Sequence, residues 1–415
     1  MKKSIIFLTI FVILAFSGWS ADKMIELVVW DQLPQTEKIV QRFNEKMEKE
    51  GRNVRARLEL IPYEQQVPKF MAALNAGNAP DIYALDIVQW PYFISIGAFR
   101  DITQWYNEQT FKNELPKGLL ELGKDGDKIF AIPYSIDLSA MLWNKDMFKE
   151  VGLDPENPPQ TWYELIQASR KLTIDKDGDG VIDQWGFALV GGGAGSYMFW
   201  LMPFIWGNGG NLFDNSGDVI LNSVGTKGAL QFWNDLLYDF KVVPESSIRY
   251  GSGERYNLFA SGKIGMFLGG NFNITTLLND APNMNFGVAP IPKNRGEFSS
   301  FGGGTLIGIT SQCKHPELAE EFLSFAFQDE MLIETFAPNL LLLPRSSLYD
   351  NNYYNKVPQM KEFVKILEYA QTPKSTKYNE LYDPIGYYFE AYLLNKIPLE
   401  EAVEKCQEEI EKIVK

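Results

Sequence analysis

The first hundred residues alternate between two hydrophobic periods. Residues 26–30 form a short apolar run, and from Thr36 onward the apolar positions recur at helical spacing. Residues 54–60 then alternate apolar and charged side chains, which is the pattern of a half-buried strand. A second helical pattern over 67–74 and a third apolar run over 82–85 follow. This order predicts a parallel sheet flanked by helices, which is one α/β lobe.

A second strand and helix series begins after a turn at 125–127. Residues 129–134 and 138–144 have strand patterns that follow one another almost without a break, and the chain is expected to change lobes there. Thr161 and Glu164 form a Thr-x-x-Glu capping box, which predicts a helix start. Further strands are predicted at 187–190, 263–268, 286–291 and 306–310, and helices at 226–240 and 316–327.

Length and charge agree with this picture and exclude several classes of protein. A chain of 415 residues exceeds what one compact core usually holds, so two lobes are expected. Lys+Arg 39 against Asp+Glu 53 gives a net charge of -14, which argues against nucleic acid or an anionic membrane as a partner. The single histidine, His315, precedes a proline in a polar stretch and is interpreted as a surface residue. One histidine argues against histidine-based catalysis and against a histidine-rich metal site.

The N-terminus has the features of a secretory signal peptide. Lys2 and Lys3 precede an apolar run over 5–16, and small residues follow up to Ser20. The run is well short of the roughly 20 residues that cross a bilayer. We expect cleavage after Ser20, or less favourably after Ser17, which makes residues 1–20 the signal peptide. The mature protein is expected in the periplasm or otherwise outside the cytoplasmic membrane.

The two cysteines are Cys313 and Cys406. Neither follows the apolar run of the signal peptide, so the protein is not expected to be a lipoprotein. Two distant cysteines do not form a disulfide framework, and the sequence leaves open whether they pair. Cys406 falls on the apolar stripe of a helical pattern over 399–413, which favours a structural, unpaired thiol.

The sharpest local motif is an acidic, glycine-containing loop at 175–183. It places oxygen ligands at positions 1, 3, 5, 7 and 9 of a calcium loop, with Gly180 at the sharp turn of position 6. Position 12 is Gly186, where an EF-hand has a bidentate glutamate, so the loop is truncated. A structural calcium site and a solvated acidic turn both remain possible readings. The candidate ligands are Asp175, Asp177, Asp179, Val181 and Asp183.

The glycine runs do not indicate a nucleotide site. Residues 191–196 lack the G-x-G-x-x-G register and a Gly-Lys-Ser/Thr sequence, and 302–304 lead into a strand. Both runs are interpreted as places where the backbone bends or approaches a ligand closely. No organic cofactor is expected. No Gly-x-Ser-x-Gly or His-Glu-x-x-His motif is present either.

Several short segments, taken in order along nearly the whole mature chain, resemble one known family. The chain is similar to the extracellular solute-binding proteins of carbohydrate ABC transporters, of the maltose-binding-protein type. The matching segments are 29–31 (VWD), 79–82 (APDI), 132–137 (IPYSID), 143–146 (WNKD), 159–162 (PQTW), the acidic loop, 209–213 (GGNLF), 262–266 (GKIGM) and 316–323 (PELAEEFL).

The resemblance implies a two-lobed type II periplasmic-binding-protein fold, in which each lobe is a mostly parallel sheet flanked by helices. The chain would pass between lobes near Asp137, Gly304 and Leu341. The N-terminal lobe would comprise 21–136 plus 305–340, and the C-terminal lobe 137–304 plus 341–415. Ligand would lie in the cleft between them, which agrees with where open α/β sheets bind ligands. Hinge closure around the ligand would follow.

The function implied is capture of a sugar for an ABC importer by a monomeric protein that is not an enzyme. Sugar hydroxyls suit planar charged groups, and sugar C–H faces suit aromatic rings. Aromatic residues make up 14% of the chain, which favours an oligosaccharide. Aromatic candidates at strand ends and helix starts are Tyr63, Trp90, Tyr134, Tyr197, Trp206, Phe272 and Tyr382.

Position by position, the resemblance gives a set of expected ligand contacts. Phe272 departs from the family pattern, which often has tryptophan in the matching Gly-x-Trp segment, and Arg345 could equally form a structural ion pair. The expected contacts are Asp31, Glu64, Asp86, Tyr134, Asp137, Tyr197, Trp206, Phe272, Gly303, Arg345 and Tyr382.

Two other classes of function remain as alternatives. A secreted glycosidase would need two carboxylates a few ångströms apart, and so acidic a chain could supply them. A calcium-dependent adhesin would depend on the acidic loop alone. Which sugar is bound is not predicted, and polyols or glycerol-phosphate-like ligands fall within the same family.

Overall fold

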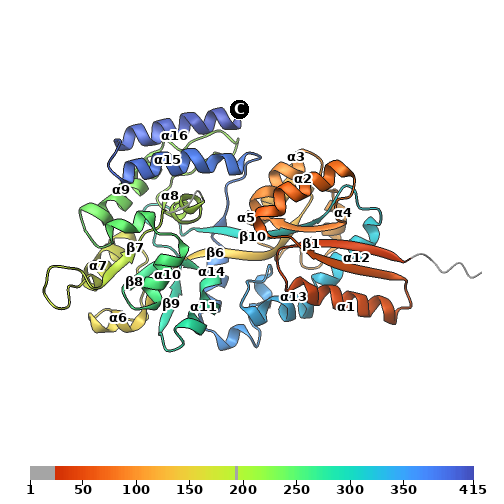
Figure 1. Cartoon of the computed structure of the whole chain (residues 1–415), viewed down its shortest axis with the longest axis horizontal. Helices are drawn as coiled ribbons and strands as arrows, with labels where there is room; N and C mark the ends of the chain where they lie inside the picture. The colour runs from red at the N-terminus through yellow and green to blue at the C-terminus, as the bar shows by residue number, and fades with distance from the viewer. Residues whose placement is uncertain (1–23, 192–194) are drawn as a thin grey trace, which may run out of the picture.

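The computed structural model describes residues 24–191 and 195–415, so the predicted signal peptide and residues 192–194 lie outside the described residues. The chain forms two lobes side by side, joined by long strands that run across the middle (Figure 1). The first lobe contains β1 (Ile25–Asp31), α1 (Thr36–Lys49), β2 (Val54–Leu60), α2 (Gln66–Ala76), β3 (Ile82–Asp86), α3 (Trp90–Ser95), α4 (Thr103–Glu108), α5 (Lys117–Leu120), β4 (Lys124–Asp125), β5 (Lys128–Ile129), α12 (Pro316–Ala326) and α13 (Asp329–Phe336).

Two strands cross between the lobes, and the second lobe is built beyond them. The crossing strands are β6 (Ile132–Asn144) and β10 (Ser300–Ile309). The second lobe contains α6 (Lys145–Glu150), α7 (Trp162–Leu172), β7 (Trp185–Ala188), α8 (Met202–Trp206), α9 (Val224–Tyr238), α10 (Ser252–Ala260), β8 (Ile264–Gly270), α11 (Phe272–Asp280), β9 (Phe286–Ala289), α14 (Gln359–Leu367), β11 (Ala370–Gln371), α15 (Tyr382–Leu393) and α16 (Leu399–Val414).

One sheet connects the two lobes, in the order β2-β1-β3-β10-β6-β8-β7, with β9 beside β6 and β11 beside β10. Parallel pairs are present in both lobes, as β1 with β2 and β3, and as β7 with β8. The crossing strands β6 and β10 form antiparallel pairs: β10 pairs with β3 and with β6, and β6 pairs with β8. In the first lobe, α2 and α3 cover one face of this sheet and α1, α12 and α13 the other (Figure 1).

The crossing differs from the prediction in one respect. Two strands were expected, over 129–134 and 138–144, but residues 132–144 form one continuous strand, β6. Its first half pairs with β10, and its second half pairs with β8 and β9. Hydrogen bonding in both lobes keeps the strand extended through Asp137, so the polar residue does not end it.

The predicted capping box located the start of one helix correctly. The Thr161 hydroxyl accepts from the Glu164 amide at 3.2 Å, and the Glu164 carboxylate accepts from the Thr161 amide at 3.1 Å, so the predicted capping box starts α7.

Cys313 and Cys406 are buried free thiols. His315 is exposed, as predicted. Among the described residues, no helix is long and apolar enough to cross a membrane.

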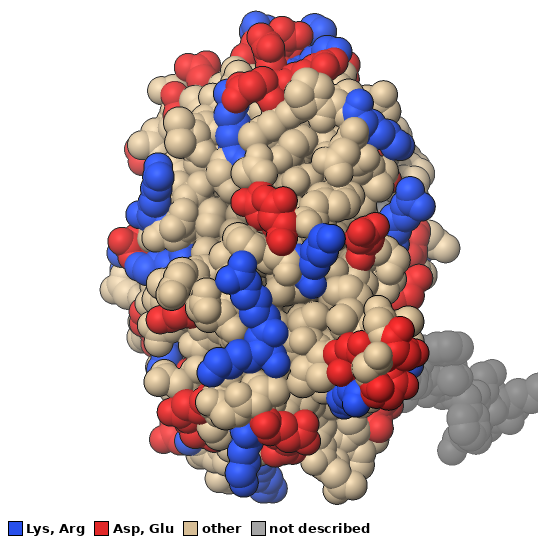
Figure 2. All heavy atoms as spheres, turned by 90° about the vertical axis from the view of Figure 1, so that its left-hand side faces the viewer, with Lys and Arg blue, Asp and Glu red and all other residues tan. Residues whose placement is uncertain are grey.

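The surface carries charges of both signs. Seen from the end of the second lobe, lysine and arginine side chains are interspersed with aspartate and glutamate side chains (Figure 2). On the described part of this face, the basic residues do not gather into one extended area. A polyanion such as nucleic acid would therefore find no continuous track there.

Candidate functional site

Two carboxylates share one face of the central sheet where the lobes meet. Asp86 ends β3 and pairs in register with Thr305 of β10, whereas Asp137 lies in β6 and pairs with Gly303. Positions 303 and 305 are two apart on one strand, so the side chains of their partners point to the same face. The negative charge of Asp137 also contributes to raising the pKa of Asp86, so the two carboxyls interact.

Burial is the main influence on both carboxyls. It raises the pKa of Asp86 to about 7; the Val88 amide, which donates to Asp86 Oδ1 at 3.1 Å, opposes this rise, and the charge of Asp137 adds to it. Burial likewise raises the pKa of Asp137, and the Asn271 amide, which donates to Asp137 Oδ1 at 3.2 Å, opposes it. Both side chains are nonetheless only partly buried by surface area, so each keeps an exposed edge.

Three tyrosines surround Asp86. The charge of Asp86 and then burial raise the pKa of Tyr63, which follows β2 and is 52% exposed. Tyr382, the first residue of α15, has its pKa raised to about 12 by burial and then by Asp86. Tyr378 packs edge-on against Tyr382, with ring centroids 5.3 Å apart. Because Asp86 belongs to the first lobe and Tyr382 to the second, this group spans both lobes.

An aromatic wall, made of Phe199, Phe272, Phe301 and Trp206, continues the site into the second lobe. Phe199 lies 5.0 Å from Phe301 and 6.2 Å from Phe272, between ring centroids. Trp206 stacks on Phe301 at 6.2 Å. Phe272 is 40% exposed, so its ring is available to a ligand.

Gly303 brings the backbone close to this wall. A Cβ placed on Gly303 would lie 3.5 Å from Phe199 Cε2 and 3.7 Å from Asp137 Cβ. A small substituent fits there without a clash, but it would occupy space between the carboxylate and the aromatic ring. The glycine thus keeps this part of the site open.

Two further features lie beside the carboxylates and the wall. A reciprocal amide pair joins the lobes: Gln89 Nε2 donates to Asn379 Oδ1 at 3.1 Å, and Asn379 Nδ2 donates to Gln89 Oε1 at 3.0 Å. Next to the wall, a pocket of about 400 Å³ is lined by Trp206, by residues 211 and 213–217, and by residues 371–374. The interlobe site therefore has room to extend past Trp206.

The structure brings most of the predicted ligand contacts into this interlobe site. Asp86, Asp137, Gly303, Phe272 and Tyr382 form its centre. Glu64 is exposed beside Tyr63, whose pKa its charge helps to raise. Trp206 is 7% exposed, and its indole N–H donates to Asn211 Oδ1 at 3.0 Å.

Asp31 and Tyr134 lie together in a separate, fully buried group of the first lobe. Thr36 Oγ1 donates to Asp31 Oδ2 at 2.5 Å and is 3.0 Å from the Tyr134 hydroxyl, which must then be the donor to Thr36. Tyr134 packs against Phe336 at 5.0 Å. Neither side chain is exposed in this conformation.

Three other predicted aromatic or basic residues also lie inside the protein. Arg345 pairs with Glu114 at 2.9 Å and with Asp329 at 2.6 Å, which is the structural ion pair considered as its alternative role. Tyr197 is 1% exposed and packs against Phe389 in the second lobe. Trp90 is fully buried, and its indole donates to the Leu85 carbonyl at 3.0 Å.

Sequence reasoning missed several residues of the site. Phe199 follows a glycine-rich segment, and Asn271 follows directly after β8, so the rule that ligand groups follow strand ends could have selected Asn271. Asn271 also accepts from the Leu138 amide at 2.9 Å, which holds β8 to β6. Tyr378, Gln89 and Asn379 carry no local signal.

The acidic loop brings three of its five candidate ligands together. Oxygens of Asp175, Asp177 and Asp183 lie within 4.8 Å of one another. Asp179 is not part of this converging set, and its Oδ1 accepts from the Val181 amide at 2.8 Å. The Gly180 amide, with that of Gly178, holds the pKa of Asp175 below its usual value.

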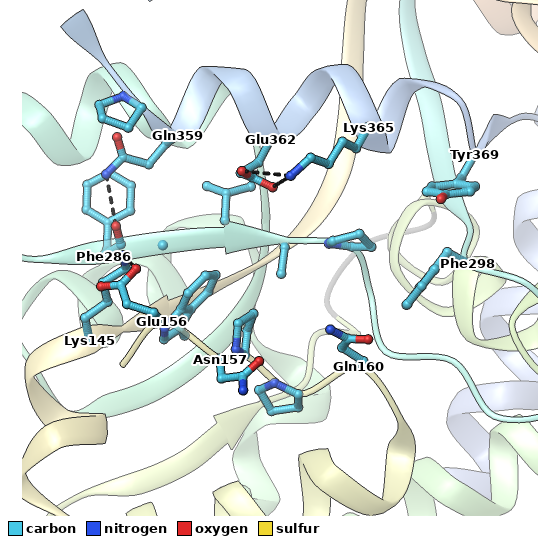
Figure 3. A pocket seen from close by; sticks show the side chains of 18 residues that line it. Lys145, Glu156, Asn157, Gln160, Phe286, Phe298, Gln359, Glu362, Lys365 and Tyr369 are labelled. Atoms are coloured by element: carbon cyan, nitrogen blue, oxygen red, sulfur yellow. Dashed lines mark hydrogen bonds and ion pairs between the residues drawn. The ribbon is translucent and has the colours of Figure 1, made fainter. Parts of the chain in front are cut away.

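Another pocket, of about 540 Å³, lies between the edge strand β9 and helix α14 (Figure 3). Several of its polar side chains are paired with neighbours: Lys145 with Glu156 at 2.6 Å, Lys365 with Glu362 at 2.9 Å, and Gln359 with the Phe286 carbonyl at 2.9 Å. None of the predicted contacts lines it. The carboxylates and aromatic rings expected of a sugar site therefore lie at the interlobe site and not in this pocket of about 540 Å³.

Comparison with known proteins gives consistent results. The sequence model of the family described as bacterial extracellular solute-binding protein matches residues 30–332. An arabinooligosaccharide-binding protein of Halalkalibacterium halodurans is 23% identical, over 85% of this chain and 81% of its own length. An sn-glycerol-3-phosphate-binding periplasmic protein of Agrobacterium fabrum is 22% identical, over 83% and 82%. The crystal structure of a cyclic alpha-maltosyl-1,6-maltose binding protein from Arthrobacter globiformis has the same fold, with a TM-score of 0.82, 22% identity and coverage of 94% of this chain and 99% of that one.

Proposed function

The chain belongs to the family of bacterial extracellular solute-binding proteins, and we propose that it captures an oligosaccharide between its lobes and delivers it to the membrane subunits of an ABC importer. The observation that carries this proposal is the interlobe site itself. Asp86 and Asp137 offer carboxylates to hydroxyl groups, and Tyr382 and Phe272 offer rings to the C–H faces of a sugar.

The extent of the site supports a ligand of two or more sugar units. The aromatic wall continues from Phe272 to Trp206, and the pocket of about 400 Å³ beyond it continues the same surface. Relatives named for arabinooligosaccharide and for a cyclic maltosyl-maltose support the same class of ligand. We infer that the protein acts as a monomer exported by residues 1–20, without a lipid anchor, and that it binds without hydrolysing the sugar.

A thermal-shift screen of the mature chain against mono- and oligosaccharides tests this function, with the sugar assayed for cleavage in parallel. A ligand at 100-fold its dissociation constant should add about 2.7 kcal/mol to the free energy of unfolding. A shift with one linkage class and intact sugar is the expected result. Cleavage would contradict the binding role, and absence of a shift with every carbohydrate would contradict the ligand class.

We also propose that the acidic loop binds one structural Ca²⁺ through Asp175, Asp177 and Asp183, whose oxygens converge. Calorimetric titration of metal-free protein should give one Ca²⁺ per chain. Asp175→Asn should abolish this binding, because it removes a charged ligand from the converging set. Asp127→Asn, a substitution in the exposed turn between β4 and β5, is the matched control and should leave it unchanged. Equal titrations for both variants would exclude the site.

A further inference from the structure

The carboxylates of the interlobe site have no counter-ion within the described residues. Asp86, Asp137 and Glu64 take part in none of the ion pairs formed by residues 24–191 and 195–415. The side-chain hydrogen-bond donors to Asp86 and Asp137 among the described residues are neutral: the backbone amide of Val88 and the side-chain amide of Asn271. Residues 192–194 are Gly-Gly-Ala, so by sequence they add no basic side chain.

Arg255 contacts the neighbouring aromatic residues but does not balance these charges. Its guanidinium carbon lies 3.8 Å from the centroid of the Trp200 ring, and Trp200 lies 6.3 Å from Phe272. The arginine is 1% exposed, and its Nε and one terminal nitrogen have no hydrogen-bond partner among the described residues. None of the causes that act on the pKa of Asp86 or Asp137 is a basic residue.

Two buried hydroxyl groups lie beside the carboxylates. The Tyr378 hydroxyl, on a side chain 3% exposed, interacts with the Tyr382 hydroxyl; burial raises the pKa of Tyr378, and Tyr382 and Asp86 add to the rise. The Thr305 hydroxyl, on the residue that pairs with Asp86, is buried without a hydrogen-bond partner among residues 24–191 and 195–415. Buried polar groups are usually hydrogen-bonded, so unpartnered ones at a binding site point to a ligand that completes them.

The ring faces of the site add a second kind of affinity for positive charge. Tyr63, Tyr382 and Phe272 present partly exposed rings around the two carboxylates. An ammonium group near an aromatic face is attracted by the ring quadrupole, most strongly where water is excluded. The carboxylates, which have no counter-ion, and the aromatic ring faces therefore both favour a positively charged ammonium group.

The consequence for the ligand follows from charge. A neutral sugar that closes the lobes removes water from both carboxylates and replaces it with hydroxyl donors only. An anionic sugar would add repulsion, whereas a cationic group would be attracted by both carboxylates. We propose that the oligosaccharide captured here carries a free amino group, protonated at neutral pH, that binds between Asp86 and Asp137. This inference rests on the proposed function of the site.

Matched sugars that differ in one substituent test the inference. For each of several linkages, calorimetry should compare a glucosamine disaccharide with the glucose and N-acetylglucosamine disaccharides of the same linkage, and with a uronic acid disaccharide. We expect the amino sugar to bind at least tenfold more tightly than its neutral counterparts, and the acidic sugar not to bind. Equal or tighter binding of a neutral sugar would overturn the inference and leave the proposed function intact. Failure of every sugar to bind would instead overturn the proposed function.

Charge-neutralising variants identify the groups responsible. Asp86→Asn and Asp137→Asn keep the shape of each side chain and remove its charge, so they should abolish the preference for the amino sugar over the neutral one. Asp127→Asn, in the distant β4–β5 turn, should keep the preference. If Asp86→Asn and Asp137→Asn retained the full preference, the amino group would not bind between these carboxylates.

The pH dependence provides a second readout that does not depend on substitutions. The groups facing Asp86 are Asp137, Tyr63, Tyr378 and Tyr382, Glu64 lies beside Tyr63, and Asn271 faces Asp137. An ammonium binds the ionised carboxylates, so affinity for the amino sugar should rise between pH 5.5 and pH 7. Affinity that falls over this range, with proton uptake on binding, would indicate a neutral ligand and contradict the inference.

Discussion

Tyr382→Ala should weaken sugar binding by about 100-fold, which corresponds to about 2.7 kcal/mol and is typical of a buried tyrosine at the centre of an interface. Tyr382 begins α15 in the second lobe, yet its hydroxyl is influenced by Asp86 in the first. Its ring also packs edge-on against Tyr378 and lies next to Gly195, where a Cβ would be 3.6 Å from Tyr382 Cζ. Loss of the ring would remove the proposed contact to the ligand and the packing against Tyr378.

The same helix provides the control for this substitution. Tyr387 is 70% exposed on α15, five residues beyond Tyr382, so Tyr387→Ala should leave the dissociation constant within about twofold. Calorimetric titration of both variants with the sugar found in the screen gives the comparison. Similar losses for the two variants, or none for Tyr382→Ala, would mean that the ligand binds away from the interlobe site.

The free energy of unfolding of the ligand-free protein should decrease as the pH rises from 5 to 7. Burial, opposed by the hydrogen bonds from Thr36, Leu33 and Gln32, raises the pKa of Asp31 to about 7, whereas the unfolded chain has the ordinary value near 4. Between these values the folded state holds a proton that the unfolded state has lost. Stability therefore falls with rising pH by up to about 1.4 kcal/mol per pH unit for each such group. Asp86 and Asp137 act in the same direction.

Carboxyls with lowered pKa values have the opposite effect at more acidic pH. Glu114, Glu321 and Glu334 have pKa values below the ordinary one, so the stability they contribute is lost only as the pH falls below about 4.5. The change in stability between pH 5 and pH 7 is therefore caused by the carboxyls whose pKa values are raised.

Chemical denaturation at pH 5, 6, 7 and 8 measures this effect. Asp31→Asn keeps Oδ1 as the acceptor for the Leu33 amide, presents Nδ2 as a donor to Thr36 Oγ1 in place of Oδ2, and cannot ionise. Between pH 5 and pH 8, the free energy of unfolding of the unmodified protein should fall by roughly 2 to 3 kcal/mol more than that of this variant. Asp127→Asn should keep the original slope. If Asp31→Asn had that slope too, Asp31 would not be the titrating group.

The sequence by itself determined the elements and the family. The apolar spacing from Thr36 to Met47 forms α1, and the alternation over 54–60 forms β2, because a single buried face imposes a period that can be read locally. The capping box at Thr161 began α7 for the same reason: its partners are three residues apart.

The resemblance to the solute-binding family also singled out residues of the candidate site. Asp86, which ends β3, and Phe272, which follows β8 after one residue, are among them. The resemblance selected Asp31, at the end of β1, in the same way. There the Thr36 hydroxyl, five residues later, holds the carboxylate inside the first lobe.

Only the tertiary structure decided which of the predicted side chains face one another. The register of β10 against β3 and β6 puts Asp86 and Asp137 on one face, and a shift of one residue would have separated them. The amide pair of Gln89 and Asn379 joins residues 290 positions apart. Such contacts leave no period in the sequence, because they depend on how two lobes pack and not on how one segment folds.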